Sequence, residues 1–224
     1  LMTPFNSITG FNSGATDTAG DVIHIDLGDG SSTGYDAGIA LLASQKLIGQ
    51  GVILNSANAG FTFPAHTRTL PAAATNPTLV RTNANSITVS SNNTIRGLTV
   101  GNTGSGIGIS GNGFGTLTIS DVTVNGTGKA VDLNNGTAAV DFDSISSTGS
   151  TTQGIDLSSL TGSFTVNGGT ISNSTGSSVL LTDVTNVSLN NLTINNSQLH
   201  GIQGLRVTTL DLTGVEITGS GNAL

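Results

Sequence analysis

Apolar and polar residues alternate along this chain in short runs separated by Gly, Asn, Ser and Asp. Runs such as Leu117-Thr118-Ile119 and Leu192-Thr193-Ile194 have a period of two residues, which is typical of a β-strand because successive side chains point to opposite faces of a sheet. Val, Ile and Leu supply most of the apolar positions, and Val and Ile favour strands. The pattern predicts an ordered β protein rather than a disordered chain rich in Gly and Ser.

The runs recur with a period of about 24 residues, which is a repeat length typical of solenoids. A small residue opens the first run of each copy, at Gly106, Ala130, Gly154, Ser178 and Gly201. A second apolar pair follows at Leu117/Ile119, Val140/Phe142, Phe164/Val166, Val187/Leu189 and Leu210/Leu212. A third cluster comes five residues later, at Val122/Val124, Ile145, Ile171, Leu192/Ile194 and Val215/Ile217. Together with an earlier copy in which Ile87/Val89 precede Ile95–Val100, the repeats predict a solenoid with three short strands in each coil.

A single coil of this size cannot fold alone. It offers about six inward aliphatic side chains at roughly 2 kcal/mol each, and ordering its backbone costs more than that. Stacking the coils about 4.8 Å apart lets each backbone bond to the coils on both sides. Equivalent strands run in the same direction in every coil, so the pairing is parallel.

Coils of this length with three short strands resemble the right-handed parallel β-helix of the pectate-lyase-like superfamily. We therefore expect an all-β fold, a single-stranded right-handed parallel β-helix (β-solenoid), with its handedness implied by the resemblance alone. The whole chain, 1–224, is interpreted as one domain. It consists of irregular N-terminal coils (1–54), a Pro-containing loop excursion (55–85) and regular coils (86–224).

The N-terminal coils carry weaker signals. Val22–Leu27 alternates as a strand, and Gly38–Leu41 and Gln45–Gly49 match the first two runs of a coil. The alternative for Ala37–Ile48 is a helix, because Ala and Leu are frequent there. The excursion concentrates prolines and large side chains, namely Phe61, Phe63, Pro64, His66, Arg68, Pro71, Pro77 and Arg81. Pro interrupts a central strand ladder, so this segment is expected to leave the coil.

Two stretches, 34–51 and 86–98, look like segments of very large bacterial surface proteins. In such proteins β-helical stretches alternate with Ig-like or other extracellular repeats. The resemblance covers about residues 20–110, and its motifs are structural. It implies an extracellular or bacterial cell-surface location and a structural or adhesive role.

Composition removes several function classes. Charged residues make up 8% of the chain, with 6 Lys+Arg against 13 Asp+Glu, and the net charge is −7. So few scattered cations cannot form a surface for nucleic acid, and no apolar run is long enough to span a membrane. The absence of Cys excludes disulfides and thiolate metal sites. Stacking explains the low charge, because a column of like charges would repel itself from coil to coil.

Asp132 and Asp156 are the main candidates for chemistry. They hold the same outward position in adjacent coils, with Lys129 nearby. Two stacked carboxylates can bind Ca²⁺ or act as an acid and nucleophile on a glycosidic bond. The alternative, which we favour, is a solvated pair whose spacing is set by the repeat. Asp141 and Asp143 are interpreted in the same way, as part of a solvated strand face and a turn.

A second candidate is the loop with Asp26, Asp29 and Asp36, which offers carboxylates for Ca²⁺. Its spacing fits neither the EF-hand nor the nonapeptide calcium repeat, so a turn is the favoured interpretation. His24, His66 and His200 lie far apart in the sequence and show no metal-ligand spacing. No cofactor is predicted, and Ca²⁺ is the one ion considered.

The sequence thus leads to two functional hypotheses. The first is a structural or adhesive solenoid segment, with glycan or cell-surface contacts and self-association through open solenoid ends into filaments. It includes the possibility of a piece cut from a longer solenoid, because no amphipathic cap follows the last coil before Leu224. The second is a polysaccharide lyase or glycoside hydrolase acting from the outer face at Asp132 and Asp156.

Overall fold

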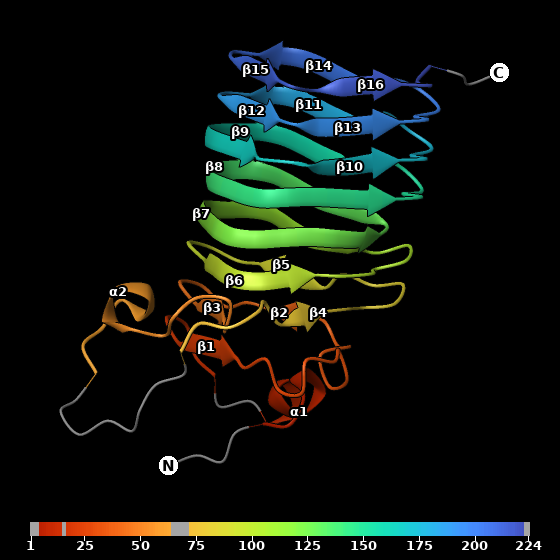
Figure 1. Ribbon diagram of the computed structural model, residues 1–224. Coiled ribbons are helices and arrows are strands. Elements are labelled where there is room, and N and C mark those ends of the chain that lie inside the picture. The colour runs from red at the N-terminus through yellow and green to blue at the C-terminus, as the bar shows by residue number, and fades with distance from the viewer. Residues whose placement is uncertain (1–4, 15–16, 64–71, 222–224) are drawn as a thin grey trace.

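The chain forms a parallel β-solenoid of about eight turns with coils of about 23 residues (Figure 1). The computed structural model describes residues 5–14, 17–63 and 72–221. In chain order its elements are α1 (Ile8–Ser13), β1 (Val22–Ile25), β2 (Ile39–Ala40), β3 (Lys46–Gly49), α2 (Ser56–Ala59), β4 (Thr78–Leu79), β5 (Ile87–Val89), β6 (Thr94–Val100), β7 (Ile107–Thr127), β8 (Lys129–Thr148), β9 (Ile155–Val166), β10 (Gly169–Ser172), β11 (Val179–Val184), β12 (Val187–Asn190), β13 (Leu192–Asn195), β14 (Ile202–Val207), β15 (Leu210–Thr213) and β16 (Glu216–Thr218). The mostly β content confirms the predicted class.

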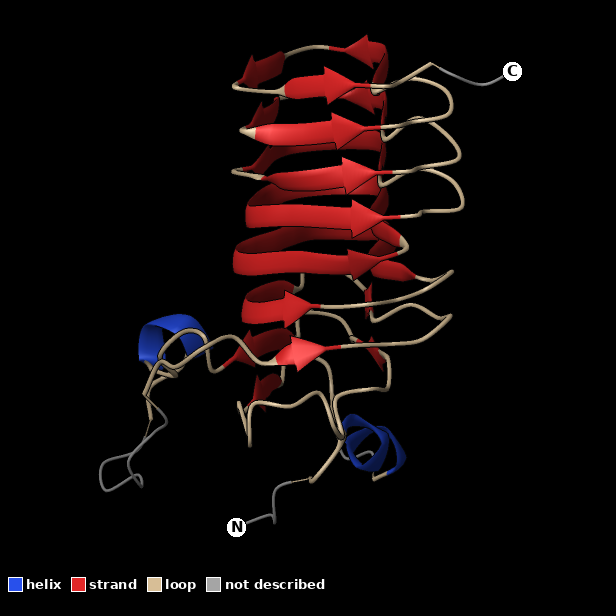
Figure 2. Ribbon diagram, turned by 45° about the vertical axis from the view of Figure 1, so that its right-hand side comes forward, coloured by secondary structure: helices blue, strands red, loops and turns tan. Residues whose placement is uncertain are grey.

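Equivalent strands of successive coils stack into three parallel sheets (Figures 1 and 2). We call these sheets the first, second and third walls, in the order in which the chain enters them within each coil. The first wall contains β2, β5, β11, β14 and the beginnings of β7, β8 and β9. The second contains β1, β3, β12, β15, the first half of β6 and the middle or end of β7, β8 and β9. The third contains β4, β10, β13, β16 and the ends of β6, β7 and β8. Every pairing between these strands is parallel, as predicted.

The register confirms most of the predicted columns. In the first wall Val131 pairs with Ile155 and Ile155 with Val179, each partner lying one coil further along the chain. In the second wall Phe164 pairs with Val187, which in turn pairs with Leu210. The inward residues of these columns are almost completely buried up to the last coil and form one continuous core.

The predicted alignment is wrong by two residues where β7 meets β8. Ile109, rather than Ile107, pairs with Val131, and Ile119, rather than Leu117, pairs with Val140. A shift of two keeps every side chain on its own face, so alternation alone cannot detect it. The step from Ile109 to Val131 is 22 residues, two fewer than the step from Val131 to Ile155, and one register shift lies between Asn112 and Gly115, where Gly113 and Gly115 both have positive φ.

A second correction concerns the third wall. Ile171 pairs with Ser147, not with Ile145 as the repeat suggested. Ser147 is buried, and its hydroxyl donates a hydrogen bond to the carbonyl of Gly128 at 2.5 Å. Ser147, a polar residue, therefore occupies an inward position at which the sequence pattern predicted an apolar residue.

The N-terminal coils are strands, and the helix alternative for Ala37–Ile48 is wrong. β1, β2 and β3 fall within the three predicted segments. β3 lies between β1 and β6 in the second wall, where Leu47 pairs with Ile95 and is completely buried. Neighbouring coils supply backbone partners on both edges of β3, which overrides the helix propensity of Ala and Leu.

The excursion leaves the stack after β3 and begins with the short helix α2, which projects from the side of the solenoid (Figure 1). The ladder resumes at β4, where Thr78 pairs with Thr99 in the third wall, before the end of the expected range. Pro77 directly precedes β4, a position in which Pro interrupts no ladder. Pro64, His66, Arg68 and Pro71 lie outside the described residues.

The two ends of the described stack differ. At the N-terminal end α1 covers the first coil, with Ile8 buried in the core and Phe11 packed against it (Figure 2). Ser7 caps this helix by accepting a hydrogen bond from the amide of Gly10. The sequence pattern did not predict α1. At the other end the inward side chains of β15 and β16 are exposed, among them Leu212 and Ile217.

Neither helix in the described part of the chain is long or apolar enough to cross a membrane.

Candidate functional site

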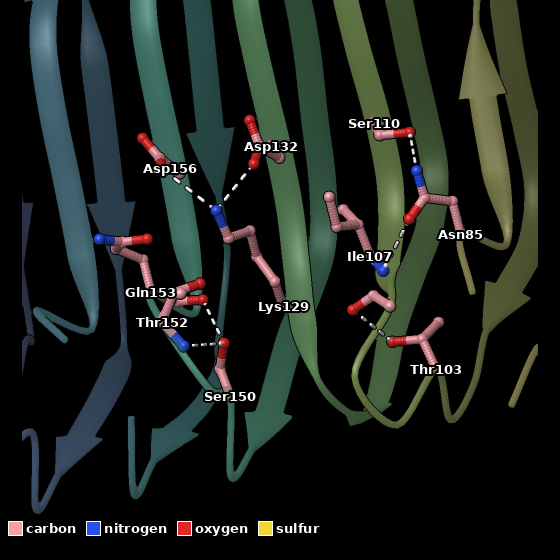
Figure 3. A network of polar contacts seen from close by, with 11 residues as sticks. Asn85, Thr103, Ile107, Ser110, Lys129, Asp132, Ser150, Thr152, Gln153 and Asp156 are labelled. Atoms are coloured by element: carbon pink, nitrogen blue, oxygen red, sulfur yellow. Dashed lines mark hydrogen bonds and ion pairs between the residues drawn. The ribbon is translucent and has the colours of Figure 1, made fainter. Parts of the chain in front are cut away.

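The strongest cluster of charged groups lies on the first wall, where Lys129 stands between Asp132 and Asp156 (Figure 3). The Lys129 Nζ atom is 2.7 Å from the Asp132 Oδ2 atom and 3.2 Å from the Asp156 Oδ2 atom. The lysine side chain is 12% exposed, against 33% and 24% for the two aspartates. One partly buried ammonium group thus holds two carboxylates.

The ladder explains this arrangement. Asp132 and Asp156 are paired residues of β8 and β9, so their side chains leave the wall at the same position in adjacent coils, as predicted. Lys129 opens β8 and lies three residues before Asp132, within reach of both carboxylates. The sequence analysis noted Lys129 as a neighbour but did not predict that it would bridge the pair.

The ion triplet limits what the two aspartates can do. A glycosidase needs one carboxyl group to donate a proton and the other to attack or activate water, with the sugar between them. Here the ammonium group occupies the position between the carboxylates. A Ca²⁺ ion on the same oxygens would have to displace Lys129. The geometry is that of a structural ion triplet, and Asp132 and Asp156 stay candidates only for a reaction that first moves the lysine.

An open groove of about 350 Å³ runs along the first wall beside Asp132. Its lining residues are Thr88, Ile107, Ser110, Gly111, Asn112, Asp132 and Asn134. Side-chain hydrogen bonds connect these coils. Asn85 donates to Ser110 at 3.0 Å (Figure 3). Asn134 donates to Asn112 at 3.2 Å. The groove therefore has a fixed polar floor of amides and hydroxyls with one carboxylate and one aliphatic side chain, Ile107.

The corrected register changes the column around the aspartates. The repeat aligned Gly108 with Asp132, but Ser110 is the residue that pairs with Asp132 from the preceding coil. In the other direction Asp156 pairs with Leu180, which pairs with Gln203, and the repeat aligned these three residues in the same way. The column therefore contains two acids flanked by neutral residues.

No family model, curated protein or solved structure matches this chain.

The structure places the second candidate group in turns. The Asp26 carboxylate accepts a hydrogen bond from the Gly28 amide, and the Asp29 carboxylate accepts one from the Ser31 amide, both at 2.9 Å. The bonds to Ser31 lower the pKa of Asp29. Among the described residues no three His, Asp or Glu side chains are grouped as a metal site requires, so Asp26, Asp29 and Asp36 are not brought together around a cation.

A third acidic group lies at the corner between the second and third walls. Burial, followed by the charges of Asp121 and Asp141, raises the pKa of Asp143. Asp121 is neutralised by Arg96, whose Nη2 atom lies 2.6 Å from its carboxylate. Asp141 accepts a hydrogen bond from the amide of Asn167 at 2.6 Å. These contacts join neighbouring coils and engage the carboxylates of Asp121 and Asp141.

The described histidines do not meet. His24 lies in β1 and lines a pocket of about 330 Å³ between α1 and the first coil. Burial lowers the pKa of His24, although Asp26 opposes the shift. His200 lies in a loop near the other end of the stack, with its Nδ1 atom 3.3 Å from the hydroxyl of Ser177. The imidazoles of His24 and His200 therefore lie in separate environments. His66 lies outside the described residues.

Sequence reasoning missed a set of buried hydroxyl groups at the corner after the third wall. Ser174, Ser178 and Ser197 are buried and hydrogen bonded to one another, with Ser178 2.7 Å from Ser197. Ser174 and Ser197 lie one coil apart, so the repeat itself would have revealed this column had polar positions been aligned as well as apolar ones. Their hydroxyls satisfy one another inside the stack, which assigns them a structural role.

Proposed function

We propose that this chain is a stiff scaffold segment of a bacterial extracellular or cell-surface protein, with a right-handed pectate-lyase-like β-helix as its architecture. The observation that carries the proposal is the continuous parallel ladder from β1 to β16, in which each coil is bonded to its neighbours. Bending such a stack requires backbone hydrogen bonds on one wall to open. Rigidity is thus a property of the whole stack rather than of one element.

The side chains of the walls support an adhesive contribution. Ladders of Asn, Ser and Thr repeat along the outside, including Asn112, Asn134 and Ser158, which are joined by hydrogen bonds of 3.2 Å. Such groups offer weak hydrogen bonds to glycans at regular spacing, and repetition turns weak contacts into useful avidity. The groove beside Asp132 is one place where a sugar would find amides, hydroxyls and an aliphatic surface together.

The second candidate is a polysaccharide-cleaving enzyme, which is favoured by one observation: Asp132 borders that same groove. In this alternative a bound polysaccharide would lie in the groove and a conformational change would withdraw Lys129. The scaffold proposal is preferred because the ammonium group already binds both carboxylates.

One experiment separates the two functions. The chain is incubated with a panel of acidic and neutral bacterial and plant polysaccharides, and both chain cleavage and retention on the immobilised polysaccharides are measured. The matched variant is Asp132→Asn/Asp156→Asn. We expect no cleavage by either protein. Cleavage by the wild type that the double variant loses would overturn the scaffold proposal in favour of the enzyme.

The location is tested separately. Intact cells of the source organism are treated with an external protease, and this segment is followed with an antibody. We expect the antibody signal to be lost from intact cells while an internal marker protein survives. Protection of the segment until the cells are lysed would contradict the proposed surface location.

A further inference from the structure

The groove beside Asp132 crosses the coils of β5, β7 and β8. Thr88, Ser110 and Asp132 supply one outward column of its lining, because each pairs with the next in the first wall. β2 and β9 continue this wall on either side, so the groove does not depend on an end of the described stack. Its volume of about 350 Å³ falls within the range of small-ligand sites, roughly 300–1,000 Å³. The groove therefore has the size of a site for a short stretch of a glycan chain.

Two polar side chains of the groove keep hydrogen-bonding capacity for a ligand. The exposed Asn112 accepts a bond from Asn134 through its side-chain oxygen. Its amide nitrogen has no partner in the described chain, so two N–H groups are left to donate to sugar hydroxyls. Asp132 contacts Lys129 through Oδ2 alone, and its Oδ1 atom is left to accept. The groove thus offers a donor and a charged acceptor, with the aliphatic surface of Ile107 beside them.

The charge beside the groove favours a cationic ligand over an acidic one. Lys129 holds both Asp132 and Asp156, so the ion triplet carries one net negative charge. Asp132 lies between Asp156 and Ser110 on the first wall (Figure 3), and its side chain is the most exposed of the three. The lining contains no Lys, Arg or His. An acidic sugar would therefore meet an excess of negative charge, whereas an ammonium group on the ligand would balance it.

We propose that this groove binds a glycan built from amino sugars with free, protonated amines. The ammonium group of one sugar binds Asp132, a sugar hydroxyl accepts a hydrogen bond from Asn112, and the C–H face of the ring packs on Ile107. Lys129 stays in place, because the ligand joins the triplet at Asp132 and adds the charge that the triplet lacks. The inference rests on the adhesive contribution proposed above and names the class of glycan.

Calorimetric titration with three oligosaccharides of equal length tests this selectivity. The probes are oligomers of glucosamine, N-acetylglucosamine and galacturonic acid, which are cationic, neutral and acidic at mildly acidic pH. We expect the glucosamine oligomer to bind most tightly and the galacturonic acid oligomer least tightly. Added salt should weaken the binding of the glucosamine oligomer, because it screens the contact with Asp132. Spermidine, which carries amines without a sugar ring, should bind more weakly than the glucosamine oligomer.

A substitution in the groove tests the role of the carboxylate. Asp132→Asn keeps the shape of the side chain and should weaken binding of the glucosamine oligomer roughly tenfold, with no loss for the N-acetylglucosamine oligomer. Asp211→Asn is the matched control, because it removes the same charge from an exposed position of the second wall, and it should leave both affinities unchanged.

The outcomes separate this inference from the adhesive proposal. Tighter binding of the neutral or the acidic oligomer, or equal affinity of the wild type and Asp132→Asn for the glucosamine oligomer, would overturn the amino-sugar assignment and leave the adhesive proposal standing. Spermidine binding as tightly as the glucosamine oligomer would also overturn the assignment, in favour of a polyamine. Failure to bind any of the three oligosaccharides would overturn both the assignment and the adhesive proposal.

Discussion

Residues with a left-handed backbone conformation (positive φ) lie at the corners of the coils. At the corner between the first and second walls φ is 60° at Asn92, 58° at Asn135, 54° at Ser159 and 54° at Asp183. Asp121 and Asn191 play this part at the next corner, and Asn173 and Asn196 at the third. Asn and Asp tolerate this conformation better than other residues with a Cβ atom, because their short polar side chains bond to the local backbone. The high Gly and Asn content of the sequence is therefore a requirement of tight corners repeated in every coil.

Two glycines in β9 and the corner that follows it provide a matched test at the residue scale. Gly162 has a φ of 82°, and a Cβ atom there would lie 2.0 Å from the Ala138 carbonyl oxygen of the neighbouring coil. Gly168 has no positive φ, and the nearest atom is 4.0 Å away. We expect Gly162→Ala to cost about 1–3 kcal/mol of unfolding free energy, and Gly168→Ala to cost nothing. Urea unfolding measures the stability of both variants. Equal urea midpoints for Gly162→Ala and Gly168→Ala would show that the backbone at Gly162 does not require glycine.

Removing the bridging ammonium group tests the ion triplet. Lys129→Met leaves two stacked carboxylates facing each other, so we expect a loss of roughly 1–2 kcal/mol in unfolding free energy that grows at low ionic strength. Adding Asp132→Asn removes the repulsion and should restore most of the loss. Thermal unfolding at two salt concentrations measures both effects. If the double variant is no more stable than Lys129→Met, repulsion between the aspartates is not the cause.

Asp143 gives a prediction for pH. Its pKa is raised in the folded chain by burial and by two neighbouring acids, so its contribution to stability is present at low pH and is lost as the pH rises through that raised value. We expect Asp143→Asn to raise the melting temperature slightly at neutral pH. The gain should vanish below about pH 4, near the ordinary pKa of an Asp side chain. A gain that persists at low pH would point to packing instead of charge.

At the scale of the elements, the alternation of apolar and polar residues predicted which face of a strand is buried better than it predicted the register between paired strands. Because a period of two residues decides which side chain is buried, it identified β1, β2, β3 and the strands from β5 onward, but not β4, which lies within the predicted excursion. It misplaced Ile107 and Ile145, because a slip of two residues changes the partner but not the face. It missed α1, a helix of six residues that carries no repeat and only one buried side chain, Ile8.

The excursion offers a prediction at this scale. Arg96 in β6 joins the second wall to α2, with its Nη1 atom 2.5 Å from the Asn58 side-chain oxygen and its other nitrogens on Asp121. Arg96→Ala should free α2 and speed limited proteolysis between residues 55 and 63, with little change in melting temperature. Arg206→Ala removes an exposed ion pair at the other end and serves as the control. Equal cleavage rates in the two variants would show that Arg96 does not hold α2.

At the scale of the whole molecule, the sequence predicted the solenoid but left its chemistry open. The period placed Asp132 and Asp156 in one column, and the structure agrees. The bridging position of Lys129 depends on the conformation of its long side chain against the folded wall. The alternation of apolar and polar residues carries no information on that conformation. The packing of Ile8 from α1 into the core likewise arises only when elements distant in sequence are assembled.

Rigidity of the stack is the central claim, and one distance tests it most directly. Thr88 and Gln203 lie in the same outward column of the first wall, joined through Ser110, Asp132, Asp156 and Leu180. Five steps of about 4.8 Å place their backbones about 24 Å apart. Spin labels at Thr88→Cys and Gln203→Cys, diluted with unlabelled chain, should give one narrow distance distribution near that value plus the label lengths. A broad distribution, or one centred far from it, would contradict a rigid stack of coils.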